Sequence, residues 1–327
     1  MATLFSPSLL QDVSVPKGGS LARLRISLSY WWRHGRLPDL DAPRSFTEWV
    51  QWRKLNERSL LLAAMTDKIA SKAMVVARLG AEWVVPTLWC GTDAPDVPTW
   101  PTPFVIKASH GCNQYAIVRD IERDWPQALA RSRTWTTQHY GKWLDEWLYS
   151  KSRPGLIVEP FIGGGAAPPT DYKVYVFNGR AEVVQVHSDR LTDHRWVQYD
   201  RDWRRLSAGA DAAPPQTLGP MIGAAEALGA GHDFLRVDFY DLPEQPLFGE
   251  FCLYPGSGLD PFDPASLDDA LGVLVEHLEK IPLAGQQLAE HSALLNARLT
   301  HVHDAAVKNR ASVMAGREGG RALRRCA

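Results

Sequence analysis

Several features that define common protein classes are missing from this sequence. Its few cysteines lie far apart and form no C-x-x-C pair, which argues against both a disulfide framework and a cysteine zinc site. No apolar run approaches the ~20 residues of a membrane span, and the N-terminus lacks a signal-peptide pattern. The formal net charge of -1 provides no basic field for nucleic acid. We therefore expect a cytoplasmic protein without a nucleic-acid partner. The cysteines are Cys90, Cys112, Cys252 and Cys326.

Two common nucleotide-binding motifs are also absent. The sequence contains no G-x-x-x-x-G-K-[ST] phosphate loop and no G-x-G-x-x-G that follows a strand. What it does contain is 327 residues with 45% hydrophobic content, enough for one large or two moderate domains. Strand and helix patterns come in mixed order with hairpins, which indicates an α+β fold rather than a doubly wound parallel sheet.

The first predicted helix covers residues 21–36. Leu21, Leu24, Leu28 and Trp32 share one face of it, and arginines surround that face. We expect this helix to pack on the protein. Its arginines and the Trp31–Trp32 pair also suit an interfacial helix, so weak peripheral contact with the inner face of a membrane is the alternative.

Further helices and strands follow from local signals. A capping box at 45–48 begins a second helix, and a third is expected from Thr66 as N-cap to Leu79, with Gly80 as its stop. The Asn178-Gly179 turn joins the clearest hairpin, between strands 171–177 and 182–187. Other strands are predicted at 104–107, 115–118 and 156–160, and other helices at 125–148, 215–229, 264–280 and 284–313.

The most informative feature is a second hairpin that carries two acids. Asp238 and Glu250 each lie within an apolar strand, and the turn at 241–246 is expected to pair the two strands. A buried carboxylate needs a cationic partner or a metal, and two neighbouring carboxylates repel each other. A divalent metal and a salt bridge to Arg236 or Arg190 both satisfy this requirement, and the hairpin alone leaves the two open.

Three lysines stand where phosphates could be held. Lys68 begins a helix, Lys107 ends a strand beside a turn, and Lys173 lies on a strand two residues after Asp171. A lysine in an apolar strand loses solvation and requires an anionic partner. That partner is either a phosphate or a nearby acid. The isolated charge Glu159 has the same two interpretations, a binding role or an ion pair with a lysine.

These residues, in this order, resemble the ATP-grasp superfamily, and within it the TupA-like branch associated with teichuronopeptide biosynthesis. The resemblance covers roughly residues 40–260. Each motif is weak alone, and the specificity comes from seven of them in sequence. The motifs are 45–48, Thr66-Asp-Lys68, 104–111, 158–161, 171–179, Asp189-Arg190 and the hairpin from Arg236 to Gly258.

The resemblance implies an ATP-grasp fold in which two α+β subdomains hold ATP. We accordingly expect a helical N-terminal extension over 1–62, a catalytic domain over 63–285 and a C-terminal helix and tail over 286–327. The catalytic domain would divide into subdomains at 63–160 and 161–285.

The resemblance also implies a role for each candidate site residue. Lys68 and Lys107 would bind the ATP phosphates, Glu159 and Phe161 would lie at the adenine, and Asp171 would bind the ribose. Lys173 and Arg190 would face the γ-phosphate and an acylphosphate. Asp238 and Glu250 would bind Mg²⁺, which bridges the phosphates. The expected activity is carboxylate–amine ligation, with a small-molecule or glycan-linked carboxylate and an amine as substrates, in building cell-surface polymers.

Two departures from the family pattern concern the same site. Residues 110–114 replace a more glycine-rich loop, and Cys252 stands where a second metal ligand is usual, although a neutral thiol is a poor ligand for Mg²⁺. A phosphotransferase on this scaffold, and a nucleotide-binding protein with degraded catalysis, are therefore the alternatives. The sequence leaves the acid, the amine and the oligomeric state open.

Overall fold

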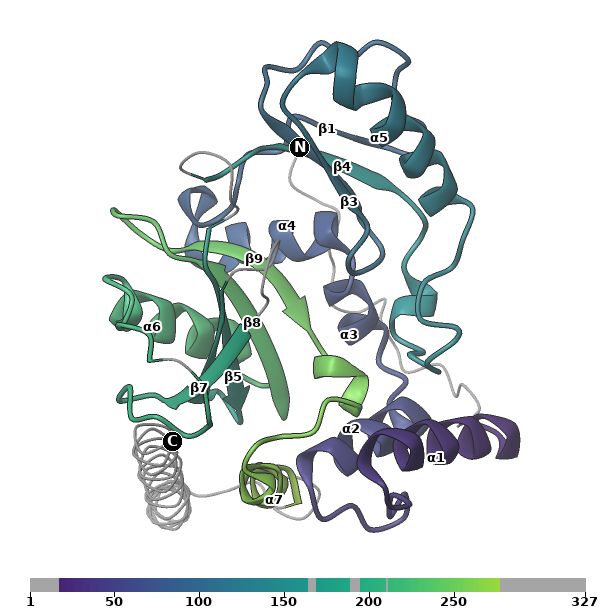
Figure 1. The fold of residues 1–327 in the computed structure, drawn as a ribbon, viewed down its shortest axis with the longest axis vertical. Helices are drawn as coiled ribbons and strands as arrows, with labels where there is room; N and C mark the ends of the chain where they lie inside the picture. Colours follow the sequence, from purple (N-terminus) through teal and green to yellow (C-terminus); the bar gives the residue numbers. More distant parts are fainter. Residues whose placement is uncertain (1–17, 164–168, 189–194, 210, 277–327) are drawn as a thin grey trace, which may run out of the picture.

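A computed structural model describes residues 18–163, 169–188, 195–209 and 211–276. It confirms the α+β class, because two antiparallel sheets stand with helices against them (Figure 1). Arg190 and the predicted segment 286–327 lie outside the described residues. The domain boundaries stay a prediction, although the smaller sheet lies within 89–160 and the larger one within 171–252.

The smaller sheet has the strand order β1-β4-β2-β3. Its strands are β1 (Trp89–Gly91), β2 (Phe104–Ala108), β3 (Tyr115–Val118) and β4 (Leu156–Pro160). Helix α5 (Ile121–Thr136) contacts β2 and β3, and Trp125 from this helix lies in the same buried cluster as Phe104 and Leu156. The three strands predicted at 104–107, 115–118 and 156–160 are confirmed. The helix predicted at 125–148 begins earlier and ends at Thr136.

The larger sheet has the strand order β7-β6-β5-β8-β9. Both predicted hairpins belong to it. Asn178 and Gly179 connect β5 to β6 with φ angles of 51° and 75°, a left-handed turn that asparagine and glycine tolerate. The strands are β5 (Asp171–Phe177), β6 (Arg180–Ser188), β7 (Arg195–Asp200), β8 (Phe234–Tyr240) and β9 (Leu247–Cys252).

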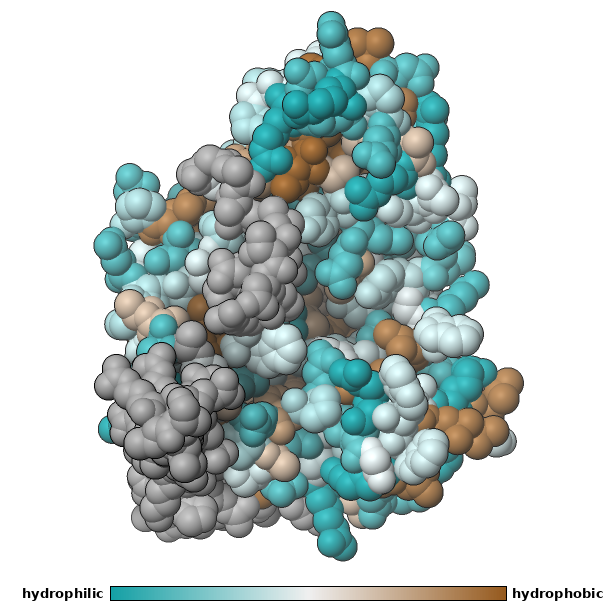
Figure 2. Space-filling view, viewed as in Figure 1, coloured by the Kyte–Doolittle hydropathy of each residue, from teal (hydrophilic) through white to brown (hydrophobic). Residues whose placement is uncertain are grey.

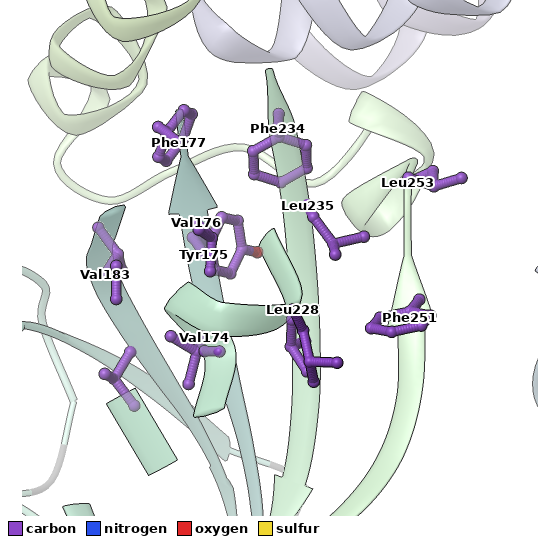
Figure 3. Packing of buried hydrophobic residues seen from close by; sticks show 14 of the residues in the cluster. Val174, Tyr175, Val176, Phe177, Val183, Leu228, Phe234, Leu235, Phe251 and Leu253 are labelled. Atoms are coloured by element: carbon purple, nitrogen blue, oxygen red, sulfur yellow. The ribbon is translucent and has the colours of Figure 1, made fainter. Parts of the chain in front are cut away.

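The two faces of the larger sheet differ in polarity, because side chains alternate along each strand. One face carries valines and phenylalanines, including Val174, Val237 and Phe239, all fully buried. Helix α6 (Leu218–Gly229) covers this face, and its Leu228 belongs to the buried cluster there (Figure 3). Gly229 of the same helix approaches Val176 too closely for a side chain. The opposite face carries the charged and polar residues of the same strands. This face points to the site described below.

Helix α2 (Phe46–Asn56) packs against one end of the larger sheet. The predicted capping box is confirmed, with Ser45 and Glu48 as its members. Phe46 meets Phe234 edge to face at a centroid distance of 4.8 Å. Asp268 of α7 (Ala265–Glu276) accepts a 2.8 Å hydrogen bond from the Thr47 amide. Helix α2 therefore belongs to the core of the larger sheet, although the sequence assigned it to an N-terminal extension.

Helices α3 (Leu60–Met65) and α4 (Lys68–Leu79) connect α2 to the smaller sheet. The N-cap of α4 is Asp67, whose side chain accepts from the amides of Ile69 and Ala70. The prediction of Thr66 in this position was wrong by one residue, because Thr66 instead closes α3. Short 3₁₀ turns lie at Ala81–Trp83, Tyr149–Lys151 and Pro255–Gly258.

Helix α1 (Ser20–His34) packs on the protein through the face opposite to the predicted apolar one. Its buried residues are Ile26 and Tyr30, and Ile26 clusters with Leu40 and Leu55. The predicted face is exposed, with Leu24 at 55% and Trp32 at 75%. Within the part of the chain that the structure describes, no helix is both long and apolar enough to span a bilayer.

Lys54 provides a pH test of the packing of α2. Its ammonium is buried and donates to Ser257 Oγ at 2.7 Å. Burial lowers the pKa of Lys54 from 10.5 to about 8, although the carboxylates of Glu146 and Asp145 oppose the shift. Between those two pH values the unfolded chain binds more protons than the folded one, so the free energy of unfolding rises with pH there.

Replacing Lys54 by methionine should remove this rise, which corresponds to about 3 kcal/mol. Denaturant unfolding of the wild type and of Lys54→Met at several pH values across the window measures the difference. The same pH dependence in both proteins would show that Lys54 is not the group responsible.

Candidate active site

A cleft of about 1010 Å³ lies between the smaller sheet and the polar face of the larger one. It brings together side chains from α4, from β2 and β4, and from β5, β8 and β9. Seven of the nine predicted site residues line this cleft, and Lys173 lies beside it through its ion pairs. The seven are Lys68, Lys107, Glu159, Phe161, Asp171, Asp238 and Glu250.

Two lysines converge on the carboxylate of Glu159. Lys107 donates to Glu159 Oε2 at 2.7 Å from the neighbouring strand, and Lys72 of α4 donates to Oε1 at 2.5 Å. Burial raises the pKa of Glu159, but the two ammonium groups more than offset this, so its pKa lies below the ordinary value. For Lys107 burial acts in the opposite direction and lowers the pKa, but the carboxylate of Glu159 more than offsets this. The pKa of Lys107 therefore lies well above its usual value.

Lys68 forms a second ion pair on another wall of the cleft. Its ammonium lies 3.0 Å from Glu250 Oε2 and donates to the carbonyl of Gly111 at 2.8 Å. Although burial opposes it, Lys68 holds the pKa of Glu250 below the ordinary value. The Glu250 side chain keeps 28% of its exposure, so this carboxylate is the more accessible of the two hairpin acids.

The third group of charges is the most deeply buried. Lys173 donates to Asp171 Oδ2 at 2.6 Å and also bonds to Asp238. Arg236 holds Asp238 with two bonds, from Nε at 2.7 Å and from Nη2 at 2.8 Å. Lys173 and Asp238 face each other across β5 and β8. The Arg236 salt bridge, one of the two alternatives left open for Asp238, is therefore present.

A second cavity of about 550 Å³ opens on the same polar face of the larger sheet. Arg236 lines this second cavity, whereas its partner Asp238 lines the first. The Arg236–Asp238 ion pair therefore separates the two cavities and touches both. Around Arg236 the wall combines aromatic rings with amide and imidazole groups, namely Tyr175, Gln185, His187, Trp196, Gln198 and Phe262.

The family model for TupA-like ATP-grasp proteins matches residues 48–276, more than half of the chain. The protein belongs to this family. The match includes both sheets and every candidate site residue, and it confirms the resemblance found in the sequence. No protein of curated function matches the sequence.

Solved structures with some similarity have low sequence identity to this chain. D-alanine–D-alanine ligase from Bacillus anthracis is 14% identical over 75% of this chain and 71% of its own, with a TM-score of 0.41. Its complex with ATP gives 15% identity over 58% and 55%, with a TM-score of 0.38. N5-carboxyaminoimidazole ribonucleotide synthetase from Thermus thermophilus gives 15% over 60% and 47%, also at 0.38. The chain thus spans about half to 71% of the length of these structures.

The ATP-grasp family implies bound Mg²⁺, and the positions of the two hairpin acids show whether they could bind it. Asp238 and Glu250 are direct cross-strand neighbours, and both line the cleft. Mg²⁺ in nucleotide sites is usually bound by one or two carboxylates together with phosphate oxygens. Within the described residues, no group of three or more acidic, histidine or cysteine side chains forms a metal cage. The pair therefore fits an ion that arrives with phosphates.

The structure corrects one premise of the metal prediction. The two hairpin acids are not left to repel each other, because Arg236 and Lys173 neutralise Asp238 and Lys68 neutralises Glu250. Cys252 is a poor ligand for Mg²⁺, because Mg²⁺ prefers hard oxygen donors, and burial raises the pKa of this thiol to about 12. Any Mg²⁺ would thus depend on the two carboxylates.

The altered loop after Lys107 is held by His110. Its Nδ1 accepts from the Gly155 amide at 3.3 Å, so Nε2 carries the proton and donates to the Gln138 carbonyl at 3.1 Å. The ring is fully buried. His110 is therefore a structural anchor, and Gly111, Asn113 and Gln114 of this loop line the cleft.

The sequence analysis did not identify Lys72, and it gave Phe161 a place at the adenine without defining which of its groups would make the contact. Lys72 lies one helical turn after Lys68, an i,i+4 spacing on α4 that would have indicated a shared face. The Phe161 amide donates to the Pro103 carbonyl at 3.0 Å and is not free to bind a base. Its ring lies 5.1 Å from the guanidinium of Arg119, which fixes this residue at the edge of the cleft.

Proposed function

We propose that this protein is an ATP-dependent ligase that joins a carboxylate to an amine. The carboxylate oxygen would attack the γ-phosphorus of ATP with ADP as leaving group. The amine nitrogen would then attack the acyl carbon of the acylphosphate, releasing phosphate and a proton. The observation that carries the proposal is that two cavities adjoin at the Arg236–Asp238 ion pair, which contributes one side chain to each, because nucleotide and carboxylate must lie next to each other.

Each residue at the first cavity has a role in this scheme. Lys68 and Lys107 would exchange their carboxylate partners for ATP phosphates, since a buried ammonium needs an anionic partner and a phosphate oxygen can take that place. Glu159 and Phe161 would lie at the adenine, and Asp171 at the ribose. Asp238 and Glu250 would hold Mg²⁺, which when bound would neutralise charge on the phosphate oxygens.

At the second cavity, Arg236 would position the incoming carboxylate. A guanidinium presents five donors in a plane, and Arg236 uses two of its nitrogen atoms on Asp238, which leaves further donors for a ligand. Lys173 would stabilise the transferred phosphoryl group from between the two cavities, together with Arg190, which lies outside the described residues. Gln185 and Trp196 would contact the rest of the substrate.

We further propose that the product is part of a cell-surface polysaccharide or peptide polymer. The TupA-like resemblance supports this assignment, and the wall of the second cavity agrees with it, because amides and an aromatic ring suit a hydroxyl-rich substrate. A cytoplasmic location follows from the use of ATP.

Hydroxylamine trapping tests the ligase proposal. With Mg-ATP, a panel of amino acids and uronic acids is offered as the carboxylate, and hydroxylamine replaces the unknown amine. We expect hydroxamate, ADP and free phosphate to form together with at least one acid. A phosphorylated product without free phosphate would instead identify a phosphotransferase. Nucleotide binding without turnover on any acid would favour the protein with degraded catalysis.

A further inference from the structure

The second cavity has charges of both signs on its wall, and the proposed function uses only the positive one. Arg236 lines the cavity from β8, and Asp260 lines it from the segment 255–262, which belongs to the connection between β9 and α7. The Arg236 side chain keeps 10% of its exposure, whereas that of Asp260 keeps 64%. The cavity of about 550 Å³ therefore combines a buried cation with an anion that solvent reaches.

The carboxylate of Asp260 is weakly engaged. Arg33 is its one charged partner among the described residues, and the 3.4 Å between Arg33 Nη2 and Asp260 Oδ1 exceeds the usual length of a hydrogen bond. Both side chains are well exposed, and such pairs contribute little to stability. The other oxygen, Oδ2, lies against Gly256, where any Cβ would collide with it. Asp260 can therefore accept a cationic ligand at low cost.

The backbone of the segment 255–262 is held in place by α1 and α2. Gln51 donates to the carbonyls of Ser257 and Gly258 at 2.8 and 2.9 Å, and His34 Nε2 lies 3.2 Å from the Gly258 carbonyl. The segment passes beside α2 in Figure 1, and Figure 2 shows hydrophilic residues prominent between the larger sheet and α1. These contacts fix the position of Asp260, as a binding residue requires.

We propose that Asp260 binds the amine substrate as an ammonium cation. This inference rests on the proposed function, in which Arg236 positions the carboxylate in the same cavity. An alkyl amine resembles the side chain of lysine, with a pKa of ~10.4, so it is protonated near neutral pH and favours an anionic partner. Trp196 and Phe262 add aromatic rings to the wall, and such rings attract cations. The substrate class is thus a primary amine that arrives with a positive charge.

The exposure of Asp260 also suits the loss of protons from the amine. The ammonium must lose one proton before its nitrogen can attack the acyl carbon, and water that reaches Asp260 can take it. The C–N bond then forms while the bond between the acyl carbon and the phosphate oxygen breaks, and the electron pair leaves with the phosphate. A second proton passes from the nitrogen to that phosphate. The products are one amide, one hydrogen phosphate and one released proton.

Competition with hydroxylamine tests this assignment. Hydroxylamine is largely uncharged near neutral pH, so it can trap the acylphosphate without an anionic partner. Glucosamine or ethanolamine is added as the protonated amine, which lowers the hydroxamate yield whether it reacts or only occupies the site. We expect inhibition by glucosamine at concentrations at which the uncharged N-acetylglucosamine has little effect. Asp260→Asn should raise the half-inhibitory concentration at least about fivefold, the contribution of one partly solvated ion pair.

Two further variants serve as controls. Asp260→Glu keeps the charge and should keep most of the inhibition, and Asp263→Asn removes an exposed acid outside the cavity lining and should behave like the wild type. Thermal melting establishes that the variants are folded. Equal inhibition of the wild type and Asp260→Asn would overturn the inference, as would wild-type hydroxamate formation that neither amine inhibits. If the wild type forms no hydroxamate with any acid, the proposed function itself fails and the inference fails with it.

Discussion

Replacing Asp238 by asparagine is expected to abolish turnover and to lower the free energy of unfolding by about 3–5 kcal/mol. The loss of stability follows from the ion pairs, because Asp238 accepts two bonds from Arg236 and one from Lys173. Lys173 keeps Asp171, but the buried guanidinium of Arg236 loses its charged partner. The loss of turnover follows from the proposed contact of Asp238 with Mg²⁺.

Denaturant unfolding and hydroxamate formation measure the two effects of Asp238→Asn. The matched control is Glu250→Gln, which should also lose turnover but with a smaller change in stability, since Glu250 and Lys68 are more exposed and Lys68 keeps the Gly111 carbonyl. If Asp238→Asn is destabilised yet Mg-ATP still stabilises it as much as the wild type, Asp238 is a structural residue and has no part in a metal site.

Replacing Lys107 by alanine is expected to weaken ATP binding by about 1.5–3 kcal/mol, the contribution of one charge-assisted contact. This corresponds to a loss of roughly 10- to 150-fold in affinity. The fold should change little, because Glu159 retains Lys72 as a partner when Lys107 is removed. Isothermal titration with a nonhydrolysable ATP analogue measures the affinity, and thermal melting measures the stability.

Lys72→Ala provides the comparison for Lys107. It removes the other partner of Glu159, yet Lys72 is not part of the lining of the cleft, so nucleotide affinity should fall much less. A Lys107→Ala protein that binds the nucleotide normally but melts far earlier would contradict the assignment. It would mean that Lys107 belongs to a structural ion pair with Glu159.

The candidate site was largely accessible from the sequence because its residues occupy conspicuous local positions. A charged residue within an apolar strand stands out regardless of the fold, and this identified Lys107, Glu159, Lys173, Asp238 and Glu250. Lys72 had a weaker signal, its i,i+4 spacing from Lys68, and a lysine on a helix is usually an exposed residue. Only the approach of β4 to α4 turns Lys72 into a partner of Glu159.

The sequence by itself determined most of the strands, both hairpins and the start of α2, whereas β1 and β7 and the starts of α4, α5 and α6 were missed or misplaced. The features that it determined depend on short-range physics: the alternation of side chains along a strand, the left-handed turn at Asn178-Gly179 and the capping box at Ser45. The family resemblance was readable for the same reason, because its motifs are short segments in a fixed order.

The tertiary structure decided which surfaces are covered and which charges meet. Helix α1 has a longer apolar face that is exposed, and contact with Leu40 and Leu55 buries the shorter face that carries Ile26. Asp238 had several candidate partners, and the pairing of β5 with β8 places Lys173 directly across from it. Burial and pairing depend on elements distant in the sequence, so no local pattern could fix them.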